Sequence, residues 1–218
     1  MNLLITGAPG AGKGTMSQKI IEEYHIPHIS SGQMFRDAMA TDTPIGNLAK
    51  TYIDQGLLVP DQVTIDMVME RLSRPDCTEG FLLDGFPRTL IQAKYFDEVS
   101  MEMNRALDGV LNIVIDFDVL AQRITGRRVC PDCGQIYHID FKPPKVEGVC
   151  DLDQAFLVQR SDDTKEQLEI RMGEYHHLTE PVLKFYSKKG LVYNINGNQS
   201  IEDVFTDINK IMERINGK

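Results

Sequence analysis

The chain has 218 residues, of which 42% are hydrophobic and 25% are charged, so it is long enough for one or two globular domains with a sizeable core. Its formal net charge of −9 at pH 7 argues against nucleic acid as the main partner, because neutralising phosphates needs a basic surface. No apolar run approaches the roughly 18 residues of a membrane helix, and Met1 leads directly into the first apolar run. We therefore expect a cytoplasmic protein with no leader peptide and no membrane partner.

The first informative stretch, residues 3–15, is an apolar run followed by a glycine-rich loop. The spacing Gly7-x4-Gly12-Lys13 fits a phosphate-binding loop, although Gly14 stands where Ser or Thr would bind Mg²⁺ directly. Glycines let successive N–H groups turn towards one point, where a helix N-terminus and a lysine add positive charge. Because a strand precedes the loop and a helix over 15–24 follows it, we expect a polyphosphate site rather than a chance turn.

The remaining apolar patterns alternate between strands and helices. We expect strands at 28–29, 81–84, 110–115 and 191–195. We expect helices within 31–74, with breaks at Thr43-Pro44 and 56–61, and at 89–103, 119–126, 164–186 (with a kink at Pro181) and 201–215. This alternation predicts an α/β fold with a parallel sheet covered by helices on both faces. Ligands of such folds bind at the carboxyl ends of the strands, where the glycine-rich loop, Asp84 and the region after Asp116 should meet.

Two further groups of residues suit phosphate chemistry. Asp84 ends a buried strand, and a carboxylate there suits Mg²⁺ or its water shell. Arginines, which clamp phosphates bidentately, stand at element ends or in loops at Arg36, Arg88, Arg123, Arg127, Arg160 and Arg171. The alternative is that each is a solvated surface charge, and this alternative is weakest for Arg88, which follows the turn after Asp84.

The cysteines predict a metal site rather than disulfides. Cys130-x2-Cys133 and, sixteen residues later, Cys150-x2-Asp153 match a zinc-ribbon pattern with Asp in place of the fourth Cys. His138 and Asp151 remain alternatives to Asp153 as the fourth ligand. The loop-rich stretch 128–159 is too short and polar to hold a core of its own, so a structural zinc ion would stabilise it. Cys77 lies outside the pattern as an ordinary thiol, and we expect His176 and His177 at the surface.

Five motifs together resemble adenylate kinases over essentially the whole chain, and in particular the bacterial long-lid form that carries a zinc knuckle. They are Gly7 to Thr15, Ser30-Ser31-Gly32-x-Met34-Phe35-Arg36, Asp84-Gly85-Phe86-Pro87-Arg88-Thr89, Thr125-Gly126-Arg127 and Arg160-Ser161-Asp162-Asp163. The resemblance implies a P-loop NTPase-like core at 1–29, 60–126 and 164–218. It also implies a helical AMP-binding insert at 30–59 and a zinc-binding lid at 127–163.

The resemblance implies the Mg²⁺-dependent reaction ATP + AMP ⇌ 2 ADP, which maintains adenine nucleotide balance, and the following residue roles. The ATP phosphates would be held by Gly10, Ala11, Gly12, Lys13, Gly14 and Thr15, and the rest of ATP would lie along Arg127, Ile136, Tyr137 and Gln199. AMP would contact Ser31, Arg36, Leu57, Leu58, Val59, Gly85, Arg88, Gln92, Arg160 and Arg171. The catalytic set would be Lys13, Arg88, Arg123, Arg160 and Arg171, with Asp84 holding Mg²⁺ through water and Cys130, Cys133, Cys150 and Asp153 holding structural Zn²⁺.

The chain departs from the usual family pattern at Ser31 and Gln33, where Thr and Asp are usual, and at Met16-Ser17, in place of Gln-Ala. Ser31 keeps the hydroxyl group, whereas Gln33 removes a charge close to Arg36. Two other functions remain open at this stage. One is a kinase for another nucleoside monophosphate, which a panel of acceptors would distinguish. The other is a nucleotide-sensing module that docks through its zinc ribbon and turns over slowly or not at all.

Overall fold

A five-stranded parallel sheet forms the centre of the protein in the computed structural model, which describes residues 1–41 and 43–217. The strands, in spatial order, are β2 (His28–Ser30), β3 (Phe81–Asp84), β1 (Asn2–Gly7), β4 (Gly109–Val114) and β7 (Val192–Asn196). The predicted parallel sheet is thus confirmed. Its register pairs Asp84 with both Ile5 and Ser30, so the carboxyl ends of three neighbouring strands meet.

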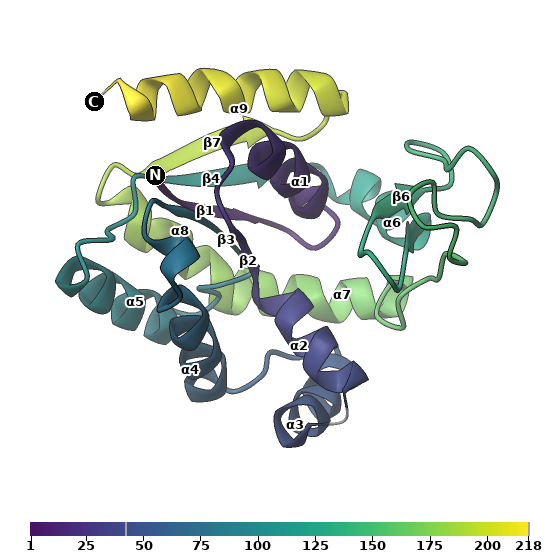
Figure 1. The fold of residues 1–218 in the computed structure, drawn as a ribbon, viewed down its shortest axis with the longest axis horizontal. Helices are drawn as coiled ribbons and strands as arrows, with labels where there is room; N and C mark the ends of the chain where they lie inside the picture. Colours follow the sequence, from purple (N-terminus) through teal and green to yellow (C-terminus); the bar gives the residue numbers. More distant parts are fainter. Residues whose placement is uncertain (42, 218) are drawn as a thin grey trace.

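Helices cover both faces of the sheet (Figure 1). Those packed on the first face include α1 (Lys13–Tyr24) and α9 (Ile201–Asn216), together with residues of α6 (Phe117–Thr125) and α7 (Lys165–Glu174). Those on the second face include α4 (Asp61–Leu72), α5 (Leu90–Glu102) and α8 (Glu180–Ser187). The short 3-10 helix Pro75–Cys77 leads into β3. Apart from residues 164–186, the expected helices and strands agree with these bounds to within two residues.

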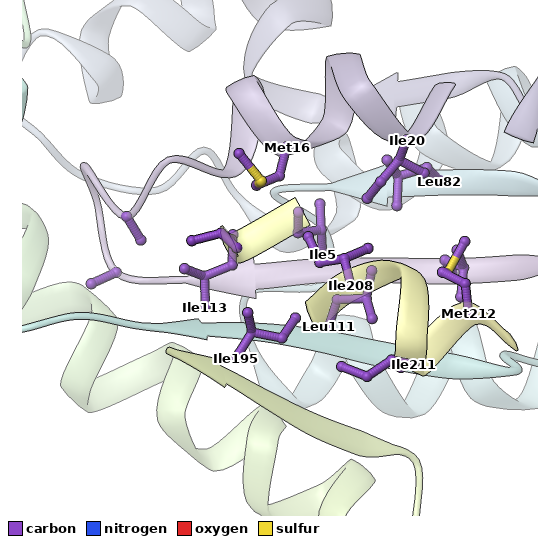
Figure 2. Packing of buried hydrophobic residues seen from close by; sticks show 14 of the residues in the cluster. Ile5, Met16, Ile20, Leu82, Leu111, Ile113, Ile195, Ile208, Ile211 and Met212 are labelled. Atoms are coloured by element: carbon purple, nitrogen blue, oxygen red, sulfur yellow. The ribbon is translucent and has the colours of Figure 1, made fainter. Parts of the chain in front are cut away.

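The core is divided by the alternation of side chains along each strand. Leu3 and Ile5 of β1 point to the first face, whereas Leu4 between them packs on the second face. Figure 2 shows Ile5 with Ile20 of α1 and Ile208 of α9 in the first layer. Because each such buried side chain contributes about 1.5–3 kcal/mol, the sheet is a firm base for the loops at its carboxyl edge.

The helix expected over 164–186 is confirmed as a continuous helical run from Lys165 to Ser187, but its irregularity lies just before Pro181. Helix α7 ends at Glu174, and a π-helical turn, Tyr175–Thr179, separates it from α8. Pro181 lies in the first turn of α8, directly after this π-helical turn, and it has no N–H group to donate to a carbonyl oxygen of the preceding turn. The wider turn before it therefore takes up the irregularity that the sequence pattern places at the proline itself.

Two segments project from the sheet and its helices as separate bodies of chain (Figure 1). The first contains α2 (Ser31–Ala40) and α3 (Pro44–Ile53), which pack around Phe35, Ala49 and Val59. The second has only the short antiparallel pair β5 (Arg127–Val129) and β6 (Ile136–His138), so its predicted loop-rich character is confirmed. Among the described residues, the helices are all too short or too polar to cross a lipid bilayer.

Candidate active site

The glycine-rich loop connects the carboxyl end of β1 to the first residue of α1, Lys13. Gly7 adopts a positive φ of 144°, and a β-carbon there would lie 2.5 Å from the carbonyl oxygen of Ile113, so only glycine fits. The Lys13 ammonium group folds back over the loop and donates hydrogen bonds to the carbonyl oxygens of Gly7 (2.8 Å) and Ala8 (3.0 Å). The loop thereby surrounds a small positively charged hollow at the start of a helix.

The Lys13 ammonium group is buried near other cations and near the carboxylate of Asp84. Burial, together with the nearby charges of Arg88 and Arg171, lowers the pKa of Lys13 to about 7, although the charge of Asp84 acts in the opposite direction. A lysine in this state binds a proton more strongly when an anion arrives beside it. The hollow is therefore suited to a polyanion such as a chain of phosphates.

Asp84 lies at the end of β3 beside His28 of the neighbouring strand, with 3.4 Å between His28 Nε2 and Asp84 Oδ2. Burial alone would raise the pKa of Asp84, but the contact with His28 and the charge of Lys13 outweigh burial and lower it. The carboxylate is thus kept ionised next to the glycine-rich loop. An ionised carboxylate in this place fits the oxygen ligands that Mg²⁺ takes, either directly or through water.

The predicted arginines converge on one cleft of about 1130 Å³ beside the loop. They come from separate elements, and the cleft is lined by Arg36, Arg88, Arg123, Arg127, Arg160 and Arg171. Burial lowers the pKa of five of them, that of Arg160 to about 9, and the direction is the same for Arg36, Arg88, Arg123 and Arg171. So many buried cations with mutual repulsion favour a bound polyanion.

Carboxylates hold two of these arginines. Arg127 makes two hydrogen bonds to the buried Asp163, one of them 2.7 Å from Nε to Oδ2, and Arg171 donates to Asp162 Oδ2 at 2.9 Å. Arg160 differs, since its buried Nε has no hydrogen-bond partner among the described residues. Asp162 and Asp163 were missed as functional residues by the sequence analysis. The Asp-Asp pair directly after Arg160-Ser161 was the available signal.

Neutral acceptors hold Arg36 and Arg88. Gln33 Oε1 accepts from Arg36 Nε (3.2 Å) and Nη2 (2.9 Å), and Arg88 Nε donates to the carbonyl oxygen of Gly85 at 2.8 Å. The same carbonyl oxygen accepts from Ser31 Oγ at 2.7 Å. Arg36 and Arg88 are therefore oriented without losing their charge, and Gln33 orients Arg36 despite lacking a carboxylate.

All residues that the sequence analysis assigned to the nucleotides line this one cleft. The set includes the loop residues Gly10, Ala11, Gly12, Lys13, Gly14 and Thr15, and Ile136, Tyr137 and Gln199 beside them. It also includes Ser31, Leu57, Leu58, Val59, Asp84, Gly85 and Gln92 together with the arginines named above. The cleft thus brings together the glycine-rich loop, the six arginines and Gln92.

A second cluster joins Cys130, Cys133, Cys150 and Asp153, whose ligand atoms all lie within 4.8 Å of one another. The Cys133 and Cys150 sulfur atoms are 3.7 Å apart, close to the roughly 3.8 Å that tetrahedral zinc with bonds of about 2.3 Å requires. Three thiols and a carboxylate are a suitable donor set for Zn²⁺, and they complete four positions.

The two alternatives for the fourth metal ligand are engaged elsewhere. His138 Nδ1 accepts from the backbone N–H groups of Asp140 and Phe141, and Asp151 Oδ1 accepts from the backbone N–H of Lys145. Asp153 is therefore the carboxylate that the fold brings to the three thiols. Cys77 lies apart from the cluster as a buried thiol beside Arg71, as expected. His176 and His177 are exposed, also as expected.

Comparisons with known proteins agree with one another. Residues 5–191 match the family described as Adenylate kinase. The chain is 52% identical over 212 residues to the adenylate kinase of Bacillus subtilis (strain 168), which covers 97% of this chain and 98% of the relative. It is also 52% identical over 214 residues to the adenylate kinase of Carboxydothermus hydrogenoformans, covering 98% and 100%. A Listeria monocytogenes adenylate kinase is 51% identical, covering 97% and 99%.

Proposed function

The chain belongs to the adenylate kinase family, and from this premise we propose how its own residues divide the work of phosphoryl transfer. It is a nucleoside monophosphate kinase that catalyses ATP + AMP ⇌ 2 ADP. The observation that carries the assignment of residues is the convergence of Lys13 and six arginines on one cleft at the carboxyl edge of the sheet.

The donor nucleotide binds along the glycine-rich loop. The backbone N–H groups at the start of α1 and the Lys13 ammonium group hold the phosphates of ATP, because both present positive charge to the same hollow. Arg127, Ile136, Tyr137 and the backbone near Gln199 line the adjoining part of the cleft and contact the nucleoside. Asp84 would hold Mg²⁺ through water, and the ion would neutralise phosphate charge.

The acceptor nucleotide binds at the other end of the cleft. Arg36 and Arg88 clamp the AMP phosphate, since neutral partners orient them and leave their charge for the ligand. Ser31, Gly85 and the loop 57–59 enclose the rest of AMP, and Gln92 contacts the base. One phosphate oxygen of AMP then faces the terminal phosphate of ATP.

The transfer needs no covalent intermediate with the protein. An AMP phosphate oxygen attacks the terminal phosphorus of ATP, the bond to the ADP oxygen breaks in line, and the products are two molecules of ADP. Arg123, Arg160 and Arg171 stabilise the charge that spreads over the transferring group. The core at 1–29, 60–126 and 164–218 carries the insert at 30–59 and the lid at 127–163, which close over the nucleotides and exclude water.

Cys130, Cys133, Cys150 and Asp153 would hold a zinc ion in the lid, where it would have a structural role. Support comes from the donor set and its spacing, which complete four positions and leave none open for substrate. Elemental analysis of protein purified without chelator should give one zinc per chain. We also place the enzyme in the cytoplasm as a monomer, for which light scattering should give a mass near 24.6 kDa.

A coupled assay with ATP and a panel of nucleoside monophosphates tests the proposed division of the cleft. AMP should be the preferred acceptor, and Lys13→Ala should remove most activity in a folded protein, by about 10²-fold or more. A folded Lys13→Ala variant that turns over near the parent rate would overturn the assignment of the phosphate loop. The full-length relatives give no support to the alternative acceptors or to a nucleotide sensor.

A further inference from the structure

Gln92, which the proposed function places against the AMP base, is held at both ends of its side-chain amide. Its Oε1 accepts a hydrogen bond of 2.7 Å from the backbone N–H of Arg88, and its Nε2 donates one of 2.8 Å to Asp61 Oδ1. Thr89 Oγ1 donates to the same Asp61 oxygen at 2.9 Å. Gln92 itself is only 2% exposed and lines the cleft.

These partners determine which end of the Gln92 amide carries the oxygen and which carries the nitrogen. A backbone N–H group only donates and a carboxylate only accepts, so the opposite orientation would set N–H against N–H and oxygen against oxygen. Each end keeps one free site: the second N–H of Nε2 and the second lone pair of Oε1. The cleft therefore presents one donor and one acceptor in a fixed order.

A hydrogen-bond donor and an acceptor held in a fixed order can distinguish purines that differ in the substituent at ring position 6. Adenine offers a donor at its 6-amino group and an acceptor at N1, whereas a 6-oxo purine offers an acceptor at O6 and a donor at N1. When Arg36 and Arg88 hold the phosphate, the base reaches Gln92 in one place, so a single amide orientation pairs with only one of the two edges. Two hydrogen bonds hold this orientation, one from the Arg88 N–H and one to Asp61. Without Asp61 only the first opposes rotation of the amide, and an amide that rotates can offer a partner to either edge.

We propose that Asp61 is a specificity-determining positioning residue, which holds the Gln92 amide in the orientation that pairs with a 6-amino purine. Asp61 acts through Gln92, since the cleft lining within the described part of the chain includes Gln92 but not Asp61. Asp61 is the first residue of α4, so the start of this helix is tied directly to the acceptor end of the cleft. This inference rests on the proposed contact between Gln92 and the AMP base.

The test compares AMP with inosine monophosphate, whose base differs from adenine only in having a 6-oxo group and an N1–H. In Asp61→Ala the AMP-to-inosine-monophosphate ratio of kcat/KM should fall by about tenfold or more, with KM for ATP unchanged. Asp61→Asn should keep the parent ratio within about threefold, because its Oδ1 still accepts from both Thr89 and Gln92. A parent ratio in folded Asp61→Ala would overturn the proposal.

Further variants separate this inference from the function on which it rests. Asp66→Ala changes an exposed acid on the same helix and should leave the ratio unchanged. If Gln92→Ala keeps the parent ratio, both the placement of the base and the role of Asp61 are wrong. If Gln92→Ala lowers the ratio but Asp61→Ala does not, only the role of Asp61 is wrong. Asp61→Ser, too short to reach Gln92, replaces Asp61→Ala should that variant not fold.

Discussion

The two ends of the cleft are built on different physical principles. The acceptor side (residues 31–59 with Arg88 and Gln92) consists of capped helices whose side chains pack around Phe35, Ala49 and Val59. The donor side (residues 7–15 and 127–163) includes the lid, whose buried cluster centres on Tyr137 and two of the thiols.

The lid leaves large apolar side chains in solvent, with Phe156 81% and Leu152 70% exposed. Apolar packing therefore stabilises the acceptor side, whereas the proposed zinc ion would supply much of the stability of the lid. The comparison teaches that one cleft can combine a segment held by apolar packing with one that gathers three thiols and a carboxylate. Perturbations of one side should leave the other side largely unchanged.

Arg88→Ala should give the largest effect, and it should be confined to the acceptor side. Losing this oriented guanidinium group should lower kcat/KM for AMP by about 10²–10³-fold. Calorimetry without AMP should show ATP affinity changed by less than about threefold, because Lys13 and the loop hold the donor phosphates. A comparable loss of ATP affinity would contradict the division into two sides.

Cys150→Ser should act on the donor side through stability. Removing one of four ligands releases the metal, and we expect the free energy of unfolding to fall by about 3 kcal/mol, or roughly 6–12 °C in melting temperature. KM for AMP should stay near the parent value at low temperature. Asp153→Cys is the matched control, which should keep the metal because four thiolates also bind zinc. Complete loss of activity in folded Cys150→Ser would contradict a structural role.

The pH dependence of ATP binding should also be confined to the donor side. Burial lowers the pKa of Lys13 to about 7, so the free enzyme loses this proton as pH rises through 7, while bound phosphates favour the protonated form. ATP affinity should therefore fall by about tenfold or more between roughly pH 7.5 and pH 9. Calorimetry on Lys13→Arg, whose guanidinium stays charged, should show a much flatter profile. An equal slope in both proteins would disprove the role of Lys13.

Gln33→Ala should give the smallest effect, on the acceptor side alone. Arg36 loses two hydrogen bonds to a neutral acceptor, and we expect KM for AMP to rise about fivefold, equivalent to about 1 kcal/mol. KM for ATP should not change. Gln55→Ala, at an exposed position of the same segment, is the control and should match the parent. Unchanged KM for AMP in Gln33→Ala would show that Arg36 is oriented by other contacts.

Features encoded by local spacing could be predicted from the sequence. The glycine-rich loop, the strand Phe81–Asp84 and the pair of cysteine turns each depend on residues a few positions apart, whose backbone preferences and side-chain period act locally. The parallel sheet followed from the alternation of apolar strands with helices. The amino-acid sequence by itself therefore determined the kind of fold and the kind of site.

Features that depend on which distant segments meet were decided by the tertiary structure. Strand register sets His28 beside Asp84, and helix packing brings Asp61 to Gln92. The lid fold directs His138 away from the thiols and Asp153 towards them. These contacts join residues far apart in the chain, and their partners are selected by the packing of the whole core, which no local pattern records.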